Sequence, residues 1–395
     1  MKIFKLKEIS EFIRNGVTIK QSISSKEGIP ITRIETISKG TIDFNKLGYA
    51  NIFETEKYKD WLLRKGDILI SHINSEKHLG KSAIFLDNDM NIIHGMNLLC
   101  VRAINNKIFP KYLQLFFKTN QYKKQIKKIM KKSVNQASFS VNDFKEILIT
   151  LPELNVQEKI IKKITILEKI LENNKLKLKL LSELTKSLFT RMFGDIRTNS
   201  KNWKIKNLDS IYYIRSSRRV FEKEYRKEGI PFFRSKEIVE LSNSKNIIPE
   251  VYISVSKYEE LKKMTGIPLK EDLLITAVGT IGKIWKVNYE KEFYFKDGNL
   301  IWLQLKNKNN FNSLSLKRIL EDSIKNKKEN LTSGSAYNAL TIDKLKKFDI
   351  IIPPIELQNK FAKRVEKIEK LSFEIEKSIK EAENLYNSLI NRYFD

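Results

Sequence analysis

Cysteine, histidine and long apolar runs are scarce in this sequence. Its 395 residues include one cysteine, Cys100, so no intrachain disulfide can form and zinc sites built from four cysteines are excluded. The only histidines, His72, His78 and His94, do not form the His-Glu-x-x-His pattern of a helical metal site. No stretch of about 18 apolar residues occurs, and the first residues lack the apolar run of a signal peptide. These absences predict a cytoplasmic protein with no metal site and no membrane span.

Motifs for catalysis and for cofactor binding are also missing. Gly80-Lys-Ser82 resembles the end of a phosphate-binding loop, but that loop requires a glycine where Ser75 stands. A DNA methyltransferase would need a glycine-rich cofactor loop and an Asn/Asp-Pro-Pro-aromatic motif, whereas the only Pro-Pro pair lies in Ile352-Pro-Pro-Ile355. We therefore expect no catalytic residues in this chain and no cofactor bound by it.

Acidic residues are outnumbered by basic ones. The sequence has 74 Lys and Arg against 47 Asp and Glu, which gives a formal net charge of +27 at pH 7. Such an excess predicts attraction to a polyanion such as DNA or to an anionic membrane surface. No strongly amphipathic basic helix with Trp or Phe anchors is evident, which favours nucleic acid. With 41% hydrophobic residues, the chain can form two or three folded domains.

The sequence contains two copies of one unit. Glu27-Gly-Ile-Pro-Ile-Thr-Arg33 returns as Glu228-Gly-Ile-Pro-Phe-Phe-Arg234, an offset of 201 residues. Phe139-Ser-Val-Asn-Asp-Phe144 returns at the same offset as Leu340-Thr-Ile-Asp-Lys-Leu345. Because self-similarity at a fixed spacing determines the architecture, we expect two tandem domains of the same topology.

Each copy has a strand-rich part followed by a long helix, which predicts an α+β fold. Short β-branched and aromatic runs punctuated by Gly, Asn and Asp predict strands at residues 68–70, 98–101, 273–276 and 300–303. A proline-containing turn then opens a long stretch without Gly or Pro, as expected for a helix. The boundaries predicted are a first globular domain at 1–151, a helix at 152–193, a linker at 194–203, a second globular domain at 204–351 and a helix at 352–395.

Both predicted helices carry a heptad seam. Its apolar members are Ile160, Ile164, Leu167, Leu171, Leu178 and Leu181 in the first helix, and Phe361, Val365, Ile368, Ile375, Ile379 and Leu389 in the second. The polar seam residues Asn174, Thr185 and Ser372 would help to fix the register at some cost in stability. We expect the helices to pair as a coiled coil, and packing of each helix on its own domain is the alternative.

The order of these features resembles the specificity subunit of type I restriction-modification systems. The resemblance covers essentially the whole chain. It rests on the helix-opening turns Pro152 to Gln157 and Pro353 to Gln358, on Lys270-Glu-Asp-Leu-Leu-Ile-Thr276 with Gly279-Thr-Ile-Gly282, and on Ser333-Gly-Ser335 before Leu340-Thr-Ile342. The first copy departs from the pattern, because His72-Ile-Asn-Ser-Glu-Lys-His-Leu-Gly80 replaces its Gly-Thr-Ile-Gly segment.

The resemblance implies that each globular domain is a target-recognition domain reading one half of a split DNA site. It also implies that the helices pair antiparallel and set the gap between the half-sites. The implied partners are double-stranded DNA, two methyltransferase subunits that bind S-adenosylmethionine, and restriction subunits that use ATP and Mg. Catalysis would lie in those partners, and methylation and cleavage would be directed by this chain.

Two other functions stay open at this point. One is a self-contained DNA methyltransferase or nuclease with fused recognition domains, against which the missing cofactor motifs argue. The other is a basic coiled-coil scaffold that uses its charge at an anionic surface.

Candidate DNA contacts divide into phosphate contacts, which need only positive charge, and base contacts, which need hydrogen-bonding side chains in a groove. The phosphate candidates lie on one face of a predicted helix, with Ile126, Ile129 and Met130 opposite, and a solvated surface is the alternative. They are Lys123, Lys124, Lys127, Lys128, Lys131 and Lys132. The base candidates are loop residues beside strands, namely Arg33, His72, Asn74, Lys77, Arg218, Arg219, Arg234, Lys236, Thr280 and Lys283. Arg33 and Arg234, which are equivalent in the repeat, could instead hold a shared structural turn.

Overall fold

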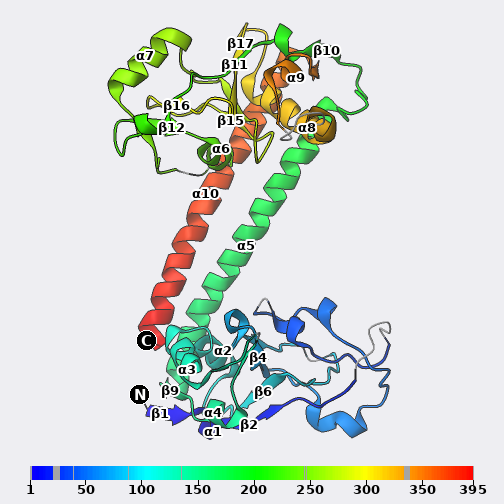
Figure 1. Cartoon of the computed structure of the whole chain (residues 1–395). Helices are drawn as coiled ribbons and strands as arrows, with labels where there is room; N and C mark the ends of the chain where they lie inside the picture. The colour runs from blue at the N-terminus through cyan, green and yellow to red at the C-terminus, as the bar shows by residue number, and fades with distance from the viewer. Residues whose placement is uncertain are drawn as a thin grey trace. The chain divides into compact units, whose positions relative to one another are not determined.

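The computed structural model describes residues 2–20, 27–38, 40–87, 89–134, 136–243, 245, 247–332 and 339–394, with no side chains described for 327–332. The chain divides into two compact units. Unit 1 consists of Met1–Leu176 with Ile375–Asp395, and unit 2 is Lys177–Glu374. Each unit combines a globular part rich in strands with a segment of each of two long helices (Figure 1).

Unit 1 is built on a four-stranded antiparallel sheet with the order β2-β6-β3-β5. A two-stranded pair β1-β9 and a three-stranded sheet β4-β8-β7 complete its strands. The strands are β1 (Lys2–Lys5), β2 (Ser10–Asn15), β3 (Ile68–Ser71), β4 (Ile73–Asn74), β5 (Ser82–Ile84), β6 (Leu98–Ala103), β7 (Lys131–Lys132), β8 (Ala137–Ser138) and β9 (Leu148–Leu151). The helices of its globular part are α1 (Leu6–Ile9), α2 (Pro110–Phe116), α3 (Asn120–Ile129) and α4 (Val141–Lys145), with 3₁₀ turns η1 (Ile34–Ile37), η2 (Phe44–Lys46), η3 (Glu56–Trp61) and η4 (Glu76–His78).

Unit 2 repeats this plan with the sheet order β11-β17-β14-β15 and the pair β10-β18, and it adds the three-stranded sheet β13-β12-β16. Its strands are β10 (Lys204–Asn207), β11 (Tyr212–Arg215), β12 (Ile230–Phe233), β13 (Tyr252–Ile253), β14 (Leu273–Thr276), β15 (Ile284–Lys286), β16 (Tyr294–Phe295), β17 (Leu300–Leu305) and β18 (Asp349–Ile352). Its helices are α6 (Ser235–Ser242), α7 (Val255–Thr265), α8 (Ser313–Thr332) and α9 (Ile342–Lys346), with 3₁₀ turns η5 (Leu208–Ser210) and η6 (Glu222–Glu224). The predicted repeat is confirmed by this shared topology, and the four predicted strands lie in β3, β6, β14 and β17.

Both faces of each four-stranded sheet are buried, because successive side chains along a strand point to opposite sides. In unit 1, Ile68 and Ile70 of β3 join the core beneath α2, α3 and α4, whereas Leu69 joins a second core on the other face. In unit 2, Leu273 and Ile275 of β14 likewise join one core, and Leu274 joins a second core on the other face of the sheet. The continuous apolar runs that predicted these strands therefore reflect burial on two sides.

The long helices α5 (Leu154–Phe193) and α10 (Ile355–Phe394) each have 40 residues. Within unit 1 their segments lie antiparallel, since Asn174 Nδ2 donates to Ser378 Oγ at 3.0 Å and Lys163 Nζ lies 3.4 Å from Tyr393 Oη. Within unit 2 the rings of Phe193 and Phe361 lie 4.8 Å apart. The predicted α+β fold class with an antiparallel helix pair is thereby confirmed.

The predicted seam residues all lie on the inner side of these helix segments. Buried are Ile160, Ile164, Leu167, Phe361, Val365 and Ile375. Partly buried are Leu171, Leu178, Leu181, Ile368, Ile379 and Leu389. Ile160 and Ile164 also pack on the globular core of unit 1, and Phe361 and Val365 on that of unit 2. The ends of the helices therefore contribute to both kinds of packing that the sequence left open.

Replacing Asn174 with leucine is expected to stabilise the helix pair of unit 1. The Asn174 side chain is 8% exposed, and an apolar seam residue is more stable there than an amide that bonds to Ser378. We expect slower hydrogen exchange in peptides of α5 that contain residue 174. The neighbouring exposed Asn173→Leu change is the control and should have little effect. Faster exchange in Asn174→Leu than in the unchanged protein would show that the amide stabilises the pair.

Candidate DNA interface

One edge of the unit 2 sheet gathers loop residues from three parts of the sequence. Strand β11 ends at Arg215, which pairs with Trp302, and β14 ends at Thr276, which pairs with Leu300. Both ends therefore lie beside the start of β17. The segments that meet there are 216–219, 277–283 and 296–299, which together form the loop edge of unit 2.

Hydrogen bonds connect these segments to one another. Ala277 N donates to the Asn299 carbonyl at 2.8 Å, and Gly298 N lies 3.4 Å from Ser216 Oγ. Lys296 N donates to the Phe233 carbonyl at 2.9 Å, so the turn after β12 adjoins the same edge. The loop edge is therefore a connected surface held by backbone contacts.

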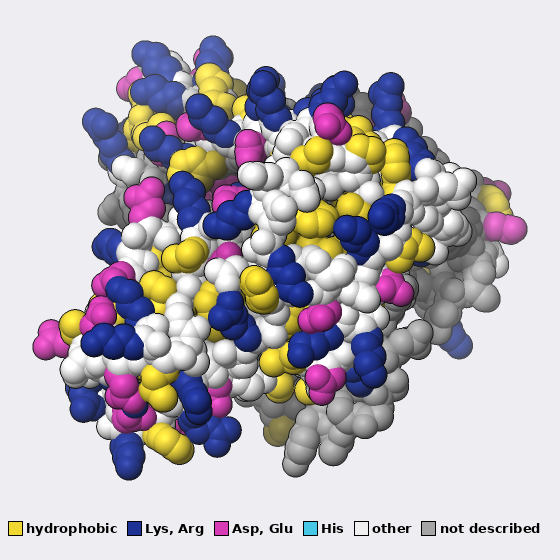
Figure 2. Space-filling view, turned by 90° about the horizontal axis from the view of Figure 1, so that it is seen from above, with side chains coloured by type: hydrophobic (Ala, Val, Ile, Leu, Met, Phe, Trp, Pro, Cys, Tyr) yellow, Lys and Arg dark blue, Asp and Glu magenta, His cyan; other side chains and the backbone are white. Residues whose placement is uncertain are grey.

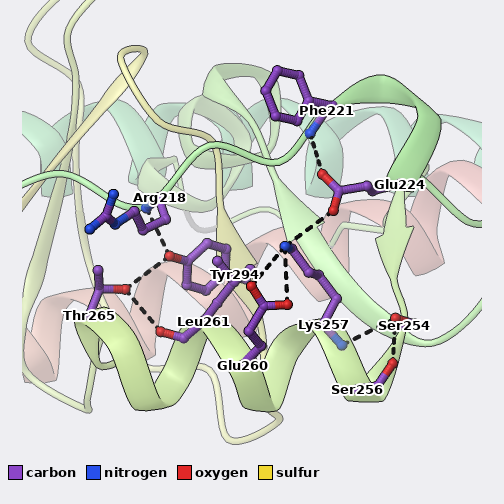
Figure 3. Close-up of polar contacts among 10 residues, drawn as sticks. All are labelled: Arg218, Phe221, Glu224, Ser254, Ser256, Lys257, Glu260, Leu261, Thr265 and Tyr294. Carbon is purple, nitrogen blue, oxygen red and sulfur yellow. Dashed lines mark hydrogen bonds and ion pairs between the residues drawn. The ribbon is translucent and has the colours of Figure 1, made fainter.

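Arg218 and Arg219 lie on a braced segment of this edge, and Figure 3 shows the contacts of Arg218. The backbone N–H of Arg218 donates to Tyr294 Oη at 2.9 Å, and that hydroxyl is 3.1 Å from Thr265 Oγ1 on α7. In Figure 3 the guanidinium of Arg218 points away from these contacts. The Nε of Arg219 lies 3.1 Å from Asp297 Oδ2. Both arginines are exposed, so the backbone is fixed while the Arg218 guanidinium stays available, and the Arg219 guanidinium is paired with Asp297.

The other end of this segment is held by a charged cluster. Phe221 N donates to the Glu224 carboxylate at 2.8 Å, and Lys257 Nζ bridges Glu224 at 3.2 Å and Glu260 at 3.1 Å (Figure 3). Lys257 is therefore a positioning residue for the turn. Sequence reasoning did not identify Lys257 or Tyr294, because neither lies beside Arg218 in the sequence.

Thr280 and Lys283 occupy the tight loop between β14 and β15. The Thr276 hydroxyl accepts from Lys283 N at 3.0 Å and bonds to the Thr280 carbonyl. Gly279 and Gly282 have φ values of +73° and +82°, a region that glycine adopts without strain. Closed in this way, the loop leaves the side chains of Thr280 and Lys283 exposed.

Unit 1 has an equivalent loop edge. Strand β2 ends at Asn15, paired with Leu99, and β3 ends at Ser71, paired with Leu98. Residues 16–20, 72–81 and 94–97 therefore meet at the start of β6 and form the loop edge of unit 1. This edge includes the predicted residues His72, Asn74 and Lys77. Arg33 adjoins it, since Thr32 N donates to the Ile93 carbonyl at 2.9 Å.

The burial of His72 argues against a contact of its side chain with DNA. Its side chain is 5% exposed and packs edge-on against Phe139, with 6.2 Å between the ring centroids. Burial lowers the pKa of His72 to about 4, so the ring is neutral at pH 7. A buried neutral ring has almost no surface to offer DNA. Asn74 is half-buried and uses its amide within the loop, at 3.1 Å from Ser71 Oγ and 2.8 Å from Ser75 N. Lys77 is exposed.

Arg33 and Arg234 begin equivalent turns. The backbone N–H of Arg33 donates to Thr36 Oγ1, and that of Arg234 donates to the Glu237 carboxylate, both at 2.8 Å. The Arg234 guanidinium also bonds Glu237 at 2.7 Å and Glu250 at 2.8 Å, and these carboxylates raise its pKa. Lys236 pairs with Glu250 as well. Arg33 has one looser contact, with its Nε 3.6 Å from Glu35. These contacts support the alternative that Arg234 holds a structural turn.

The predicted lysine face is shorter than expected. Lys123, Lys124, Lys127 and Lys128 are exposed on α3, whose buried side chains are Tyr122 and Ile126. The helix ends at Ile129 because Met130 adopts an extended conformation, with ψ of 130°. Lys131 and Lys132 then form β7, and Lys132 pairs with Glu76 at 2.8 Å. These last two lysines were wrongly assigned to the helix.

Positive charge by itself does not locate the interface. Figure 2 shows Lys and Arg side chains over the coloured part of the face in view, interspersed with Asp, Glu and hydrophobic side chains. The loop edges are identified as the candidate interface because hydrogen bonds join loops from separate parts of the sequence there. The segment Ser333-Gly-Ser335 lies outside the described residues. Within the described ranges, no group of three or more His, Cys, Asp or Glu side chains could hold a metal ion. None of the helices described there is long and apolar enough to span a bilayer.

The two buried histidines of unit 1 make its stability depend on pH. Burial lowers the pKa of both His72 and His94 to about 4, below the ordinary value of 6.5. His94 Nε2 also bonds the Leu98 carbonyl at 2.9 Å. The unfolded chain therefore binds protons that folded unit 1 rejects, so stability is full above pH 6.5 and falls as the pH drops toward 4. Titration of the ring C–H signals by NMR should give pKa values near 4, and a value near 6.5 for either ring would contradict its burial.

Known proteins resemble this chain over most of its length. The family model described as type I restriction modification DNA specificity domain matches twice, at residues 1–182 and 200–383. The putative type I restriction enzyme MjaX specificity subunit of Methanocaldococcus jannaschii is 33% identical, over 95% of this chain and 88% of its own. The type I restriction enzyme EcoKI specificity subunit of Escherichia coli is 25% identical over 53% of this chain and 46% of its own.

Solved structures share the fold. The S subunit of the type I restriction-modification system from M. genitalium matches with a TM-score of 0.66 at 15% identity, covering 100% of this chain and 96% of that one. A chain from a structure concerned with complex assembly and conformational transition of the type I system matches with a TM-score of 0.52 at 16% identity, covering 99% and 96%. At such identities the likeness establishes the fold alone.

Proposed function

The chain belongs to the family of type I restriction modification DNA specificity proteins, with the specificity domain present twice, and we propose that its two loop edges read the two halves of a split DNA site. The observation that carries this proposal is the duplicated loop edge. Each edge joins loops from separate parts of the sequence on a rigid sheet, which suits recognition of bases at fixed positions.

The side chains at the two edges differ, so the half-sites should differ in sequence. Unit 2 presents Arg218, Arg219, Thr280 and Lys283, which can bond to base edges or phosphates. Unit 1 presents Lys77, and the lysines of α3 supply positive charge next to it. Phosphate contacts would give most of the affinity, and base contacts would give the specificity.

Catalysis would reside in partner subunits. The relatives are named specificity subunits of restriction enzymes, and this supports assembly with two methyltransferase subunits and with restriction subunits. S-adenosylmethionine, ATP and Mg would then be bound by the partners, and this chain would be a non-catalytic subunit. Large apolar side chains outside the seam are exposed on α5 and α10, and such side chains suit a docking surface. They are Val156, Ile166, Ile170, Leu176 and Leu385 in unit 1, and Leu180, Leu184, Leu371 and Phe373 in unit 2.

Replacing Arg218 and Lys283 with glutamine tests the loop edge of unit 2. If either side chain reads a base, affinity for the full site should fall roughly 10- to 100-fold, with relaxed base preference in one half-site only. The control is Lys204→Gln with Lys206→Gln on β10, which removes the same charge at a strand outside the four-stranded sheet. Binding is measured by fluorescence anisotropy at fixed salt. Equal losses in both double variants, or relaxed preference in both half-sites, would argue against base reading by this edge.

A further inference from the structure

A cavity of about 510 Å³ lies in unit 1 beside the loop edge. One wall is formed by the loop that contains Leu79, Gly80 and Lys81, and the other is formed by α3. Its apolar lining consists of Leu79, Phe117, Tyr122, Ile126 and Met130. The volume falls within the range of small-molecule sites, which is roughly 300–1,000 Å³.

The rim of this cavity is strongly cationic. It carries Lys77, Lys81, Lys118, Lys123 and Lys127 against one acidic residue, Glu76. Glu76 is already paired with Lys132 at 2.8 Å, and Lys118 with Glu168 at 2.9 Å. Among the described residues, no hydrogen bond or ion pair engages the ammonium groups of Lys77, Lys123 and Lys127. Three ammonium groups are thus available around the apolar lining, which forms the floor of the cavity.

The second copy shows that the shared fold does not require a lysine at position 123. A Cβ built on Gly80 would lie 3.2 Å from Ile126, and one on the equivalent Gly282 would lie 2.8 Å from Ile324. Ile126 and Ile324 therefore occupy the same place against the loop. Counting from them, Lys123 corresponds to Glu321 in unit 2, and Lys127 corresponds to Lys325. Unit 1 therefore carries a lysine at position 123 where its duplicate carries an acidic residue, whereas the lysine at position 127 is shared by both copies.

We propose that the cavity binds a single nucleotide, with the base on the apolar floor and the phosphate on Lys123 and Lys127. An anion alone would leave the apolar floor unused, and an uncharged aromatic ligand would leave the unpaired lysines unused. A nucleotide satisfies both, because it joins a flat ring to a phosphate. The source is either a free mononucleotide or an unpaired nucleotide of a DNA strand. Binding of this ligand does not depend on sequence-specific reading of a duplex.

Calorimetric titration of the full chain with dAMP tests the floor and the rim separately. Deoxyribose 5-phosphate, which lacks the base, should bind roughly tenfold or more weakly than dAMP. The double variant Lys123→Glu with Lys127→Glu should weaken dAMP binding by roughly tenfold or more. Lys124→Glu with Lys128→Glu is the matched control, because it makes the same charge change on exposed positions of α3 that do not line the cavity. This control should change the affinity less than about threefold.

Competition against bound dAMP distinguishes the two sources. A duplex with one unpaired adenosine should displace dAMP at lower concentration than the fully paired duplex if DNA is the source, and equal displacement identifies the free nucleotide. The proposal is overturned if dAMP does not bind, if it binds no better than deoxyribose 5-phosphate, or if both double variants lose affinity equally.

Discussion

Replacing Gln157 with leucine is expected to lower the free energy of unfolding of unit 1 by roughly 3–5 kcal/mol, since each buried polar group left without a partner costs about 1–3 kcal/mol. The side chain is 0% exposed and fixes the start of α5. Its Oε1 accepts from Phe109 N at 3.1 Å, and its Nε2 donates to the carbonyls of Lys107 at 3.1 Å and Pro152 at 3.0 Å. Leucine would fill the space but leave all three backbone groups unpaired.

The second copy offers an internal comparison. Gln358 is also 0% exposed, and it bonds Asn312 N at 3.0 Å and the Pro353 carbonyl at 2.7 Å. Gln358→Leu should therefore destabilise unit 2 and leave unit 1 unchanged. Hydrogen exchange in urea, read from peptides of each unit, separates the two effects. Glu158→Ala is the exposed control and should cost less than about 0.5 kcal/mol. If Gln157→Leu cost no more than this control, the glutamine would not be what fixes the helix start.

Inserting one heptad into both long helices is expected to lengthen the preferred gap between half-sites by about three base pairs. Seven residues add about 10.5 Å of helix at 1.5 Å per residue, and each base pair spans about 3.4 Å. The insertions would follow Leu176 in α5 and Glu374 in α10, where the chain passes between the units. A whole heptad keeps the seam in register, so the bases read by each unit should stay the same.

A set of duplexes with fixed half-sites and gaps varied by single base pairs measures this effect. The gap that gives the tightest binding should be longer in the double insertion. A heptad inserted in one helix alone should weaken binding at every gap, because that helix is then seven residues longer than its partner. An unchanged optimum in the double insertion would contradict the role of the helices as a spacer.

The sequence predicted features that depend on local pattern. Heptad spacing located both helices, and the 201-residue offset between the copies recurs between α5 and α10. Strands β3, β6, β14 and β17 were predictable because strands buried on both faces form continuous apolar runs.

Features that depend on pairing between distant segments were not predictable. Lys131 continues the helical spacing of α3, yet it lies in strand β7 and pairs with Ser138 of β8. Strand β8 pairs in turn with Ile73 of β4. The burial of His72 arises from the same contacts. Arg218 and Lys283 come together only because the ends of β11 and β14 both lie beside the start of β17. The spacing of residues in the sequence does not indicate that β11 and β14 pair with the same strand.

The most direct measurement is selection of bound duplexes from a random library by this chain, co-purified with the methyltransferase subunit proposed as its partner, at near-physiological salt. Two fixed blocks of different sequence, separated by an unspecified gap of constant length, are the predicted result. A single continuous block, or no enrichment, would contradict a reader with one loop edge for each half-site.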